Sequence, residues 1–215
     1  MTAAKVKDSA PHRLIVEGRD DQWSIIELTA KHGWNWEHPD PGYPYIEDAK
    51  GSTLALEALP VTLRSYRRVG IVLDADIAPG DRWQSLGDRL SGTGFPLPAR
   101  PAPAGTVSEA PDGKHLGIWL MPDNQNPGKL EDFLALLVPQ ADPCWDWSAE
   151  STARASQLGA GFTQPDFIKA RIHTWLAWQK EPALPFGTAI RAATFAHDTD
   201  AARRFVTWME RLFIR

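Results

Sequence analysis

Two apolar runs that each stop abruptly at carboxylates constrain the fold of this chain more than any other feature. Residues 14–16 (LIV) are followed by EGRDD at 17–21, and residues 69–73 (VGIVL) are followed by DAD at 74–76. Near-continuous apolar runs of this kind are typical of buried strands in a parallel sheet. Ligands of open α/β sheets bind just outside the carboxyl ends of such strands. We therefore expect both acidic segments to face one crevice.

Carboxylates gathered in one crevice repel each other unless some are protonated or a cation lies among them. Hard oxygen donors of this type suit Mg²⁺ or Mn²⁺. Asp74 and Asp76 are two residues apart, so at a strand end they are expected to face the same side and to converge on one ion. The sequence therefore predicts a site for a divalent metal ion.

Other acids extend the candidate site. Asp20 and Asp21 either ligate the metal or cap the helix that follows the first strand, and we expect one of them, Asp21 in our assignment, to be a ligand. Asp123 follows a third apolar run and adds to the acidic cluster. Glu131 lies in the first turn of the next helix, where metal ligation and simple complementarity to the helix dipole are equally open readings. Lys129 either neutralises a developing phosphate charge or is an ordinary surface lysine.

Taken together, these segments resemble a known superfamily. Glu17-Gly18 followed by Asp21, then Asp-x-Asp at 74–76, is similar to the Toprim domain of topoisomerases, bacterial primases, small maturation ribonucleases and the overcoming-lysogenization-defect nucleases. Residues 117–124, followed by 128–134, resemble a compact Toprim-like bacterial family related to those nucleases. The resemblance covers residues 10–140. It implies that Glu17 is a metal ligand or general base.

The resemblance implies metal-dependent phosphodiester hydrolysis of DNA or RNA, with Mg²⁺ or Mn²⁺ as cofactor. A topoisomerase needs a separate tyrosine-bearing cleavage domain, for which the chain has no room, and a primase normally brings a zinc module that one cysteine, Cys144, cannot build. Related anti-phage nucleases often act with an ATPase. Because this chain has no phosphate-binding loop of its own, an ATPase subunit is an expected partner.

Two other functions remain open from the sequence. Leu-Asp-Ala-Asp at residues 73–76 also resembles the metal-binding Asp-x-Asp of nucleotide-sugar glycosyltransferases, although that reading leaves Glu17-Gly18 unexplained. The chain could instead be a non-catalytic, regulatory Toprim-like subunit of a larger complex. A neighbouring ATPase gene would favour a partnership, and a capsule or cell-wall gene cluster would favour the transferase.

Charge and composition limit the partners. The chain has 215 residues and a net charge of −4, so bulk electrostatic attraction to nucleic acid is not expected. Positive charge is local, in two arginine groups: Arg64, Arg67 and Arg68, and Arg203, Arg204, Arg211 and Arg215. No apolar stretch is long enough to span a bilayer, and residues 1–11 lack the apolar core of a signal peptide. With a single cysteine, we expect a cytoplasmic protein.

The order of the elements predicts an α/β fold, with a Rossmann-like, mainly parallel sheet flanked by helices and a C-terminal helical appendage. The expected boundaries are a Toprim-like catalytic domain at 10–140 and a helical extension at 141–215 that packs on it. Expected strands are 12–17, 45–47, 68–73 and 116–121, and expected helices are 20–32, 52–59, 79–90 and 129–138. Residues 91–113 read as a long surface loop. The extension is expected to bury most of its tryptophans.

Overall fold

The structure is a computed structural model that describes residues 10–214, and these residues form an α/β fold around one sheet. Five strands pair in the order β2-β1-β3-β5-β4. Their bounds are β1 His12–Val16, β2 Tyr45–Asp48, β3 Arg68–Asp74, β4 Thr106–Glu109 and β5 His115–Met121. β2, β1, β3 and β5 run parallel, and β4 is antiparallel to β5 at one edge. The expected mainly parallel sheet is therefore confirmed.

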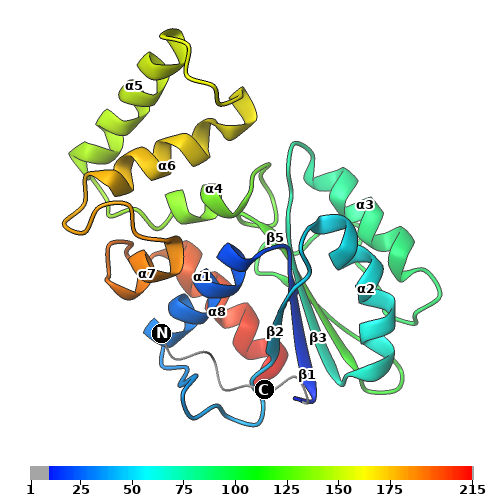
Figure 1. Cartoon of the computed structure of the whole chain (residues 1–215). Coiled ribbons are helices and arrows are strands. Elements are labelled where there is room, and N and C mark those ends of the chain that lie inside the picture. Colours follow the sequence, from blue (N-terminus) through cyan, green and yellow to red (C-terminus); the bar gives the residue numbers. More distant parts are fainter. Residues whose placement is uncertain (1–9, 215) are drawn as a thin grey trace.

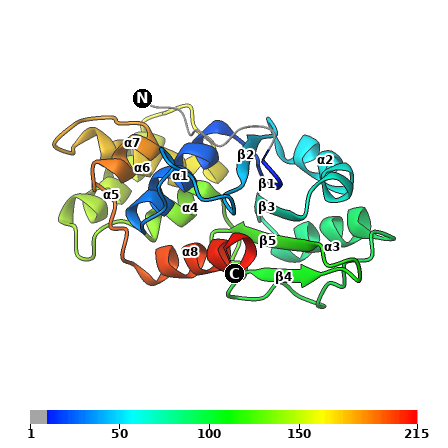
Figure 2. The same cartoon turned by 90° about the horizontal axis from the view of Figure 1, so that it is seen from below.

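Helices cover both faces of the sheet (Figures 1 and 2). In chain order they are α1 Arg19–Lys31, α2 Ser52–Ser65, α3 Pro79–Leu90, α4 Leu130–Ala135, α5 Pro143–Gln157, η1 Gln164–Asp166, α6 Phe167–Ala177, α7 Phe186–Arg191 and α8 Asp200–Phe213. α2 and α3 cover one face, and α1 and α8 cover the other. The C-terminal third is helical, as expected.

Burial on both faces explains why the central strands are continuously apolar. In β3, Ile71 and Leu73 belong to the core shared with α2 and α3, whereas Val72 belongs to the core shared with α1 and α8. All three are fully buried. Alternate side chains of a strand point to opposite faces, so a strand covered on both sides needs an apolar residue at each position.

α8 is part of the main core. Its Leu212 packs over Gly70 of β3 and Gly117 of β5, where a Cβ atom on either glycine would meet the leucine side chain. Arg68 at the start of β3 donates a hydrogen bond to the Leu212 carbonyl oxygen at 2.5 Å. Because Gly70 and Gly117 have no side chain, the two paired strands leave a groove in which α8 lies.

The remaining C-terminal helices lie toward the carboxyl ends of the strands. α5 packs on α6, α6 contacts α4, and α7 packs along α1 (Figure 1). Trp175 and Trp208 are fully buried, but Trp147 and Trp178 are 58% and 42% exposed. The expectation that this region buries most of its tryptophans is thus met only in part.

Several boundaries differ from those expected. The supposed loop at 91–113 contains β4, a four-residue strand whose inward residues, Thr106 and Ser108, are polar and gave no apolar signal. α2 continues beyond residue 59 through Pro60 to Ser65, because burial of Leu59 and Leu63 holds the helix together despite the lost backbone hydrogen bond. α4 stops at Ala135 rather than at residue 138.

The strand order places a topological switch point between β1 and β3. β2, which follows β1 in the chain, pairs with one edge of β1, and β3, which follows β2, pairs with the opposite edge of β1. At such a point the adjoining loops diverge and leave a crevice at the carboxyl ends of the strands. Both acidic segments begin there. Within residues 10–214, no helix is long and apolar enough to cross a membrane.

The glycine groove under α8 gives a stability prediction. Gly117→Ala should lower the free energy of unfolding by about 1–3 kcal/mol, because the new methyl group overlaps Leu212 in a close-packed core. Gly87→Ala in α3 is the matched control: its Cβ meets no atom within 4 Å, and removing a helical glycine should stabilise by about 0.5–1 kcal/mol. Urea unfolding of both variants measures the two shifts. Equal effects would contradict the packing assigned to α8.

Candidate functional site

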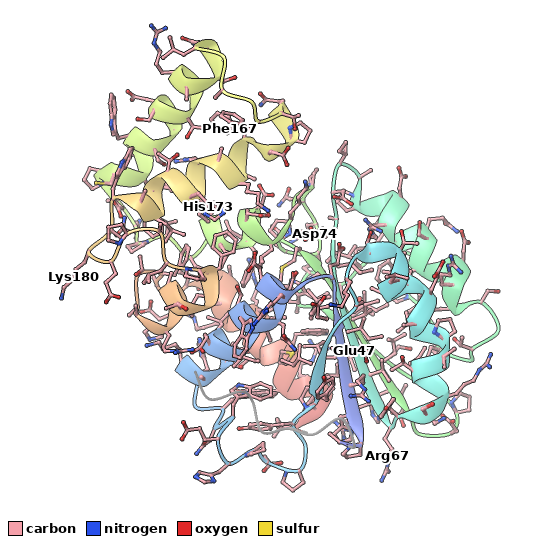
Figure 3. The ribbon with its side chains drawn as sticks, in the orientation of Figure 1. Glu47, Arg67, Asp74, Phe167, His173 and Lys180 are labelled. Carbon is pink, nitrogen blue, oxygen red and sulfur yellow. The ribbon has the colours of Figure 1, made fainter. Side chains whose placement is uncertain are left out.

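Glu17 and Asp74 meet at the switch point. The Asp74 backbone N–H donates to Glu17 Oε1 at 2.8 Å, and Asp74 Oδ1 accepts a hydrogen bond from the Leu130 backbone N–H at 3.0 Å. Figure 3 shows Asp74 at the end of β3 that faces α4 and α6, with Arg67 at the opposite end of the strand. One chain of hydrogen bonds therefore joins the loop after β1, the end of β3 and the start of α4.

Asp21 lies on the first turn of α1 and is buried. Its Oδ2 accepts from the Gly18 backbone N–H at 3.1 Å, so it satisfies one of the free donors at the helix start. The same side chain lines the crevice beside Asp74. Asp21 thus caps α1 and also lines the cavity, whereas Asp20 is exposed at the rim; metal ligation by Asp21 stays a prediction.

A backbone bridge positions α4 beside β3. Asp76 and Gly128 exchange two hydrogen bonds, N–H to O, at 2.9 and 2.8 Å. Gly128 has φ = 144°, and a Cβ there would meet Asp132, whose carboxylate caps α4 by accepting from the Lys129 N–H at 2.8 Å. The bridge brings Lys129 and Glu131 to the same crevice as Asp74.

These groups line an open cavity of about 350 Å³. Its walls come from the start of α1, the end of β3, the start of α4, and the η1–α6 segment. The lining residues are Gly18, Arg19, Asp20, Asp21, Asp74, Lys129, Leu130, Glu131, Pro165, Asp166, Ile168 and Lys169. Glu17 does not line the cavity; it lies behind Asp74 and holds its backbone.

The acids of the cavity are short of positive charge. Burial, followed by the neighbouring charges of Glu17, Asp21 and Glu131, raises the pKa of Asp74 to about 8. Burial, with Glu17 next, raises the pKa of Asp21 to about 7. Burial also raises the pKa of Glu17, against the hydrogen bond from the Asp74 N–H. Carboxyl groups that hold protons near neutral pH mark a place where a cation would be stabilised.

Two lysines face the acids. Lys169 of α6 approaches the buried Glu131 with Nζ to Oε1 at 3.1 Å, and this carboxylate raises the pKa of Lys169. Lys129 Nζ lies 4.0 Å from Asp166 of η1. Both lysines are partly exposed, so they can reach a ligand in the cavity.

Besides Glu17, the structure leaves two expected ligands, Asp76 and Asp123, outside the cavity. β3 ends at Asp74, and Asp76 adopts φ = 54°, which breaks the strand alternation that would have put both on one side. Asp76 instead pairs with Arg82 of α3 at 2.5 Å. Asp123 closes its own turn: it accepts from the Gln125 and Asn126 backbone N–H groups, and these bonds, with one from the Asn126 side chain, lower its pKa despite partial burial.

The donor set fits a hard divalent cation. Among residues 10–214, no three His, Cys, Asp or Glu side chains form a ready metal site, and each inner carboxylate has a protein partner. Mg²⁺, however, usually keeps several waters and is held by one or two carboxylates together with substrate phosphates. Asp74 and Asp21 supply such a pair at the cavity wall.

Sequence reasoning missed the contribution of the C-terminal third. Lys169 and Asp166 line the cavity, yet they come from the η1–α6 segment, to which the Toprim resemblance does not extend. No motif marks them, because their role depends on α6 packing against α4. Of the arginine groups, Arg64, Arg67, Arg203 and Arg204 are exposed, Arg68 is engaged with α8, and Arg215 lies outside the described residues.

Comparison with known proteins places this architecture in a family. A family model described as "Protein of unknown function (DUF3226)" matches residues 11–214, from β1 through α8. The chain therefore belongs to the DUF3226 family. None of the curated proteins and none of the solved structures compared with the chain matches it.

The raised carboxyl pKa values predict how stability depends on pH. Asp74 titrates near 8 in the folded chain but near 3.8 when unfolded, so the folded state holds a proton that the unfolded state releases. The contribution of Asp74 to the free energy of unfolding should therefore be fully present below about pH 4. It should be lost progressively as the pH rises to about 8. Asp21 acts in the same direction, up to about 7.

Asp74→Asn tests this, because the amide keeps the acceptor for the Leu130 N–H and cannot ionise. In chelator, the slope of unfolding free energy against pH between 5 and 7 should become flatter by about 1 kcal/mol per pH unit. Glu57→Gln, an exposed position on α2, is the control and should leave the slope unchanged. Parallel curves for wild type and Asp74→Asn would contradict the electrostatics of the site.

Proposed function

We propose that this protein is a Toprim-like, Mg²⁺- or Mn²⁺-dependent nuclease that hydrolyses phosphodiester bonds. The observation that carries the proposal is a cluster of four acids beside two lysines at the switch point of a mainly parallel sheet. Asp21 and Glu131 are buried, and Glu17 and Asp74 are half-buried. Acids of raised pKa attract a divalent cation, and the lysines attract the phosphate that such a cation would activate.

The residues of the cavity have different roles in the proposed reaction. A bound divalent ion would supply a Lewis acid and lower the pKa of a water molecule. Asp74 and Asp21 are the residues that would hold it, and Glu17 orients Asp74 through its backbone N–H. Lys129 lies on the cavity wall, where its charge stabilises the negative charge that develops on phosphate. Glu131 anchors Lys169 at the opposite wall.

The glycosyltransferase alternative finds no support in the geometry, because it needs Asp74 and Asp76 on one ion and Asp76 is paired with Arg82. We place the nuclease in the cytoplasm. With a net charge of −4, the isolated chain should bind nucleic acid weakly, so an ATPase or DNA-binding subunit is the proposed partner for full activity. A purely regulatory subunit is the alternative that the activity test addresses.

Metal binding should release protons. Calorimetric titration with Mn²⁺ should show affinity that rises by at least about tenfold from pH 6 to pH 8.5, because acids with pKa values near 7 and 8 must lose their protons to bind. The observed enthalpy should depend on the ionisation enthalpy of the buffer. Asp74→Asn should abolish binding, and Asp123→Asn should leave it intact because Asp123 is occupied in its own turn. Binding by Asp74→Asn equal to wild type would overturn the site.

Activity is tested with labelled single- and double-stranded DNA and RNA in Mg²⁺, Mn²⁺ or EDTA. The lone chain should show weak, metal-dependent cleavage that Asp74→Asn and Glu17→Ala, which removes the acceptor for the Asp74 N–H, each reduce by at least about 100-fold, equivalent to about 2.7 kcal/mol of transition-state stabilisation. A partner ATPase should raise the rate at least about tenfold. Absence of cleavage under all conditions, with Mn²⁺ bound, would favour the regulatory subunit.

A further inference from the structure

A second cavity adjoins the acidic one along α1. It has a volume of about 230 Å³ and lies between α1 and α7, which pack side by side (Figure 1). Arg19 and Asp20 line both cavities, so the two lie next to each other at the start of α1. Pockets for drug-sized molecules occupy roughly 300–1,000 Å³, and this smaller one therefore suits a single ring system.

The walls of this second cavity suit a flat aromatic group. Trp23 is partly buried and lines the cavity together with Pro185, Gly187 and Thr188. Gly187 packs closely on Trp23: a Cβ on this glycine would lie 2.9 Å from the tryptophan Cβ and 3.0 Å from its carbonyl carbon. The absence of a side chain at residue 187 therefore lets α7 approach the backbone of α1 closely at Trp23. The Thr188 side chain adds a hydroxyl that can donate and accept hydrogen bonds.

Side chains on one face of α1 extend from the acidic cavity along the second cavity. Asp20, Trp23 and Glu27 are spaced three and four residues apart, so they form one stripe along α1. At the far end of the stripe, Arg191 of α7 pairs with Glu27, with Arg191 Nε to Glu27 Oε2 at 3.0 Å, while 47% of the arginine side chain remains exposed. A third cavity of about 500 Å³ continues past Trp23 and Arg191 to Trp34 and Trp36.

We propose that the cavity between α1 and α7 binds an unpaired nucleobase, stacked on Trp23, next to the phosphate held by the acidic cavity. The inference rests on the proposed function and gives its substrate class: single-stranded nucleic acid. In a duplex the bases are stacked inside the helix and do not reach such a cavity. Stacking on tryptophan is tolerant of sequence and gives affinity without positive charge. Stacking can therefore supply affinity for a nucleic acid in a chain with net charge −4, in which Asp20 and Glu27 on the same stripe attract no phosphate.

Binding in EDTA separates this subsite from cleavage. The probes are three fluorescein-labelled 12-mers: oligo(dT), an abasic strand with the same number of phosphates, and a duplex. Anisotropy should show oligo(dT) binding about tenfold more tightly than the abasic strand and the duplex, a difference of about 1.4 kcal/mol. Trp23→Ala should remove the difference and Trp23→Phe should keep most of it. Trp147→Ala, which truncates a 58% exposed tryptophan on α5, is the matched control and should behave as wild type.

Thr188→Leu is the second test, because it fills the cavity without removing Trp23 from the core. It should also abolish the preference for oligo(dT), with an unchanged melting temperature. Equal affinity for oligo(dT) and the abasic strand, or an undiminished preference in both Trp23→Ala and Thr188→Leu, would overturn the base subsite and leave the nuclease proposal standing. A Trp23-dependent preference for oligo(dT) without cleavage in any metal would retain the subsite and overturn the nuclease proposal.

Discussion

The parallel pairing of β1 with β3 is the constraint on which the rest of the structure depends. It sets Val16 beside Val72 in register, so that both strands end at the same edge and the loops that follow diverge. Glu17 then accepts the backbone N–H of Asp74, and Asp74 accepts that of Leu130. Three segments that are far apart in the sequence meet through two hydrogen bonds, and the crevice opens between them.

Holding these acids together opposes their ionisation. Burial and mutual repulsion raise the pKa values of Glu17, Asp21 and Asp74, and the fold offsets part of this cost with the N–H donors of Gly18, Asp74 and Leu130. Among the described residues these acids form no ready metal site, but carboxyl groups whose pKa values are raised in this way would be stabilised by a cation. Binding of that cation would return stability to the fold, since a ligand that binds only the folded state stabilises it.

The C-terminal third completes both the core and the site. α8 lies in the groove made by Gly70 and Gly117, and α6 brings Lys169 to Glu131. α7 forms one wall of the second cavity beside Trp23. The family match across residues 11–214 agrees with this interdependence, since the matched region includes every helix after β5.

The sequence by itself determined the parallel strands, their acidic ends and hence the edge of the sheet at which a site would form. It did so because burial on both faces demands continuous apolar runs, and a run that stops at Glu17 or Asp74 marks where burial stops. Only the tertiary structure decided which acids meet: the left-handed conformation of Asp76 turns it to Arg82, and Asp123 closes its own turn. It also decided that Lys169 lines the acidic cavity and that α7 forms a wall of the cavity beside it, because contacts between helices distant in sequence leave no local pattern in the chain.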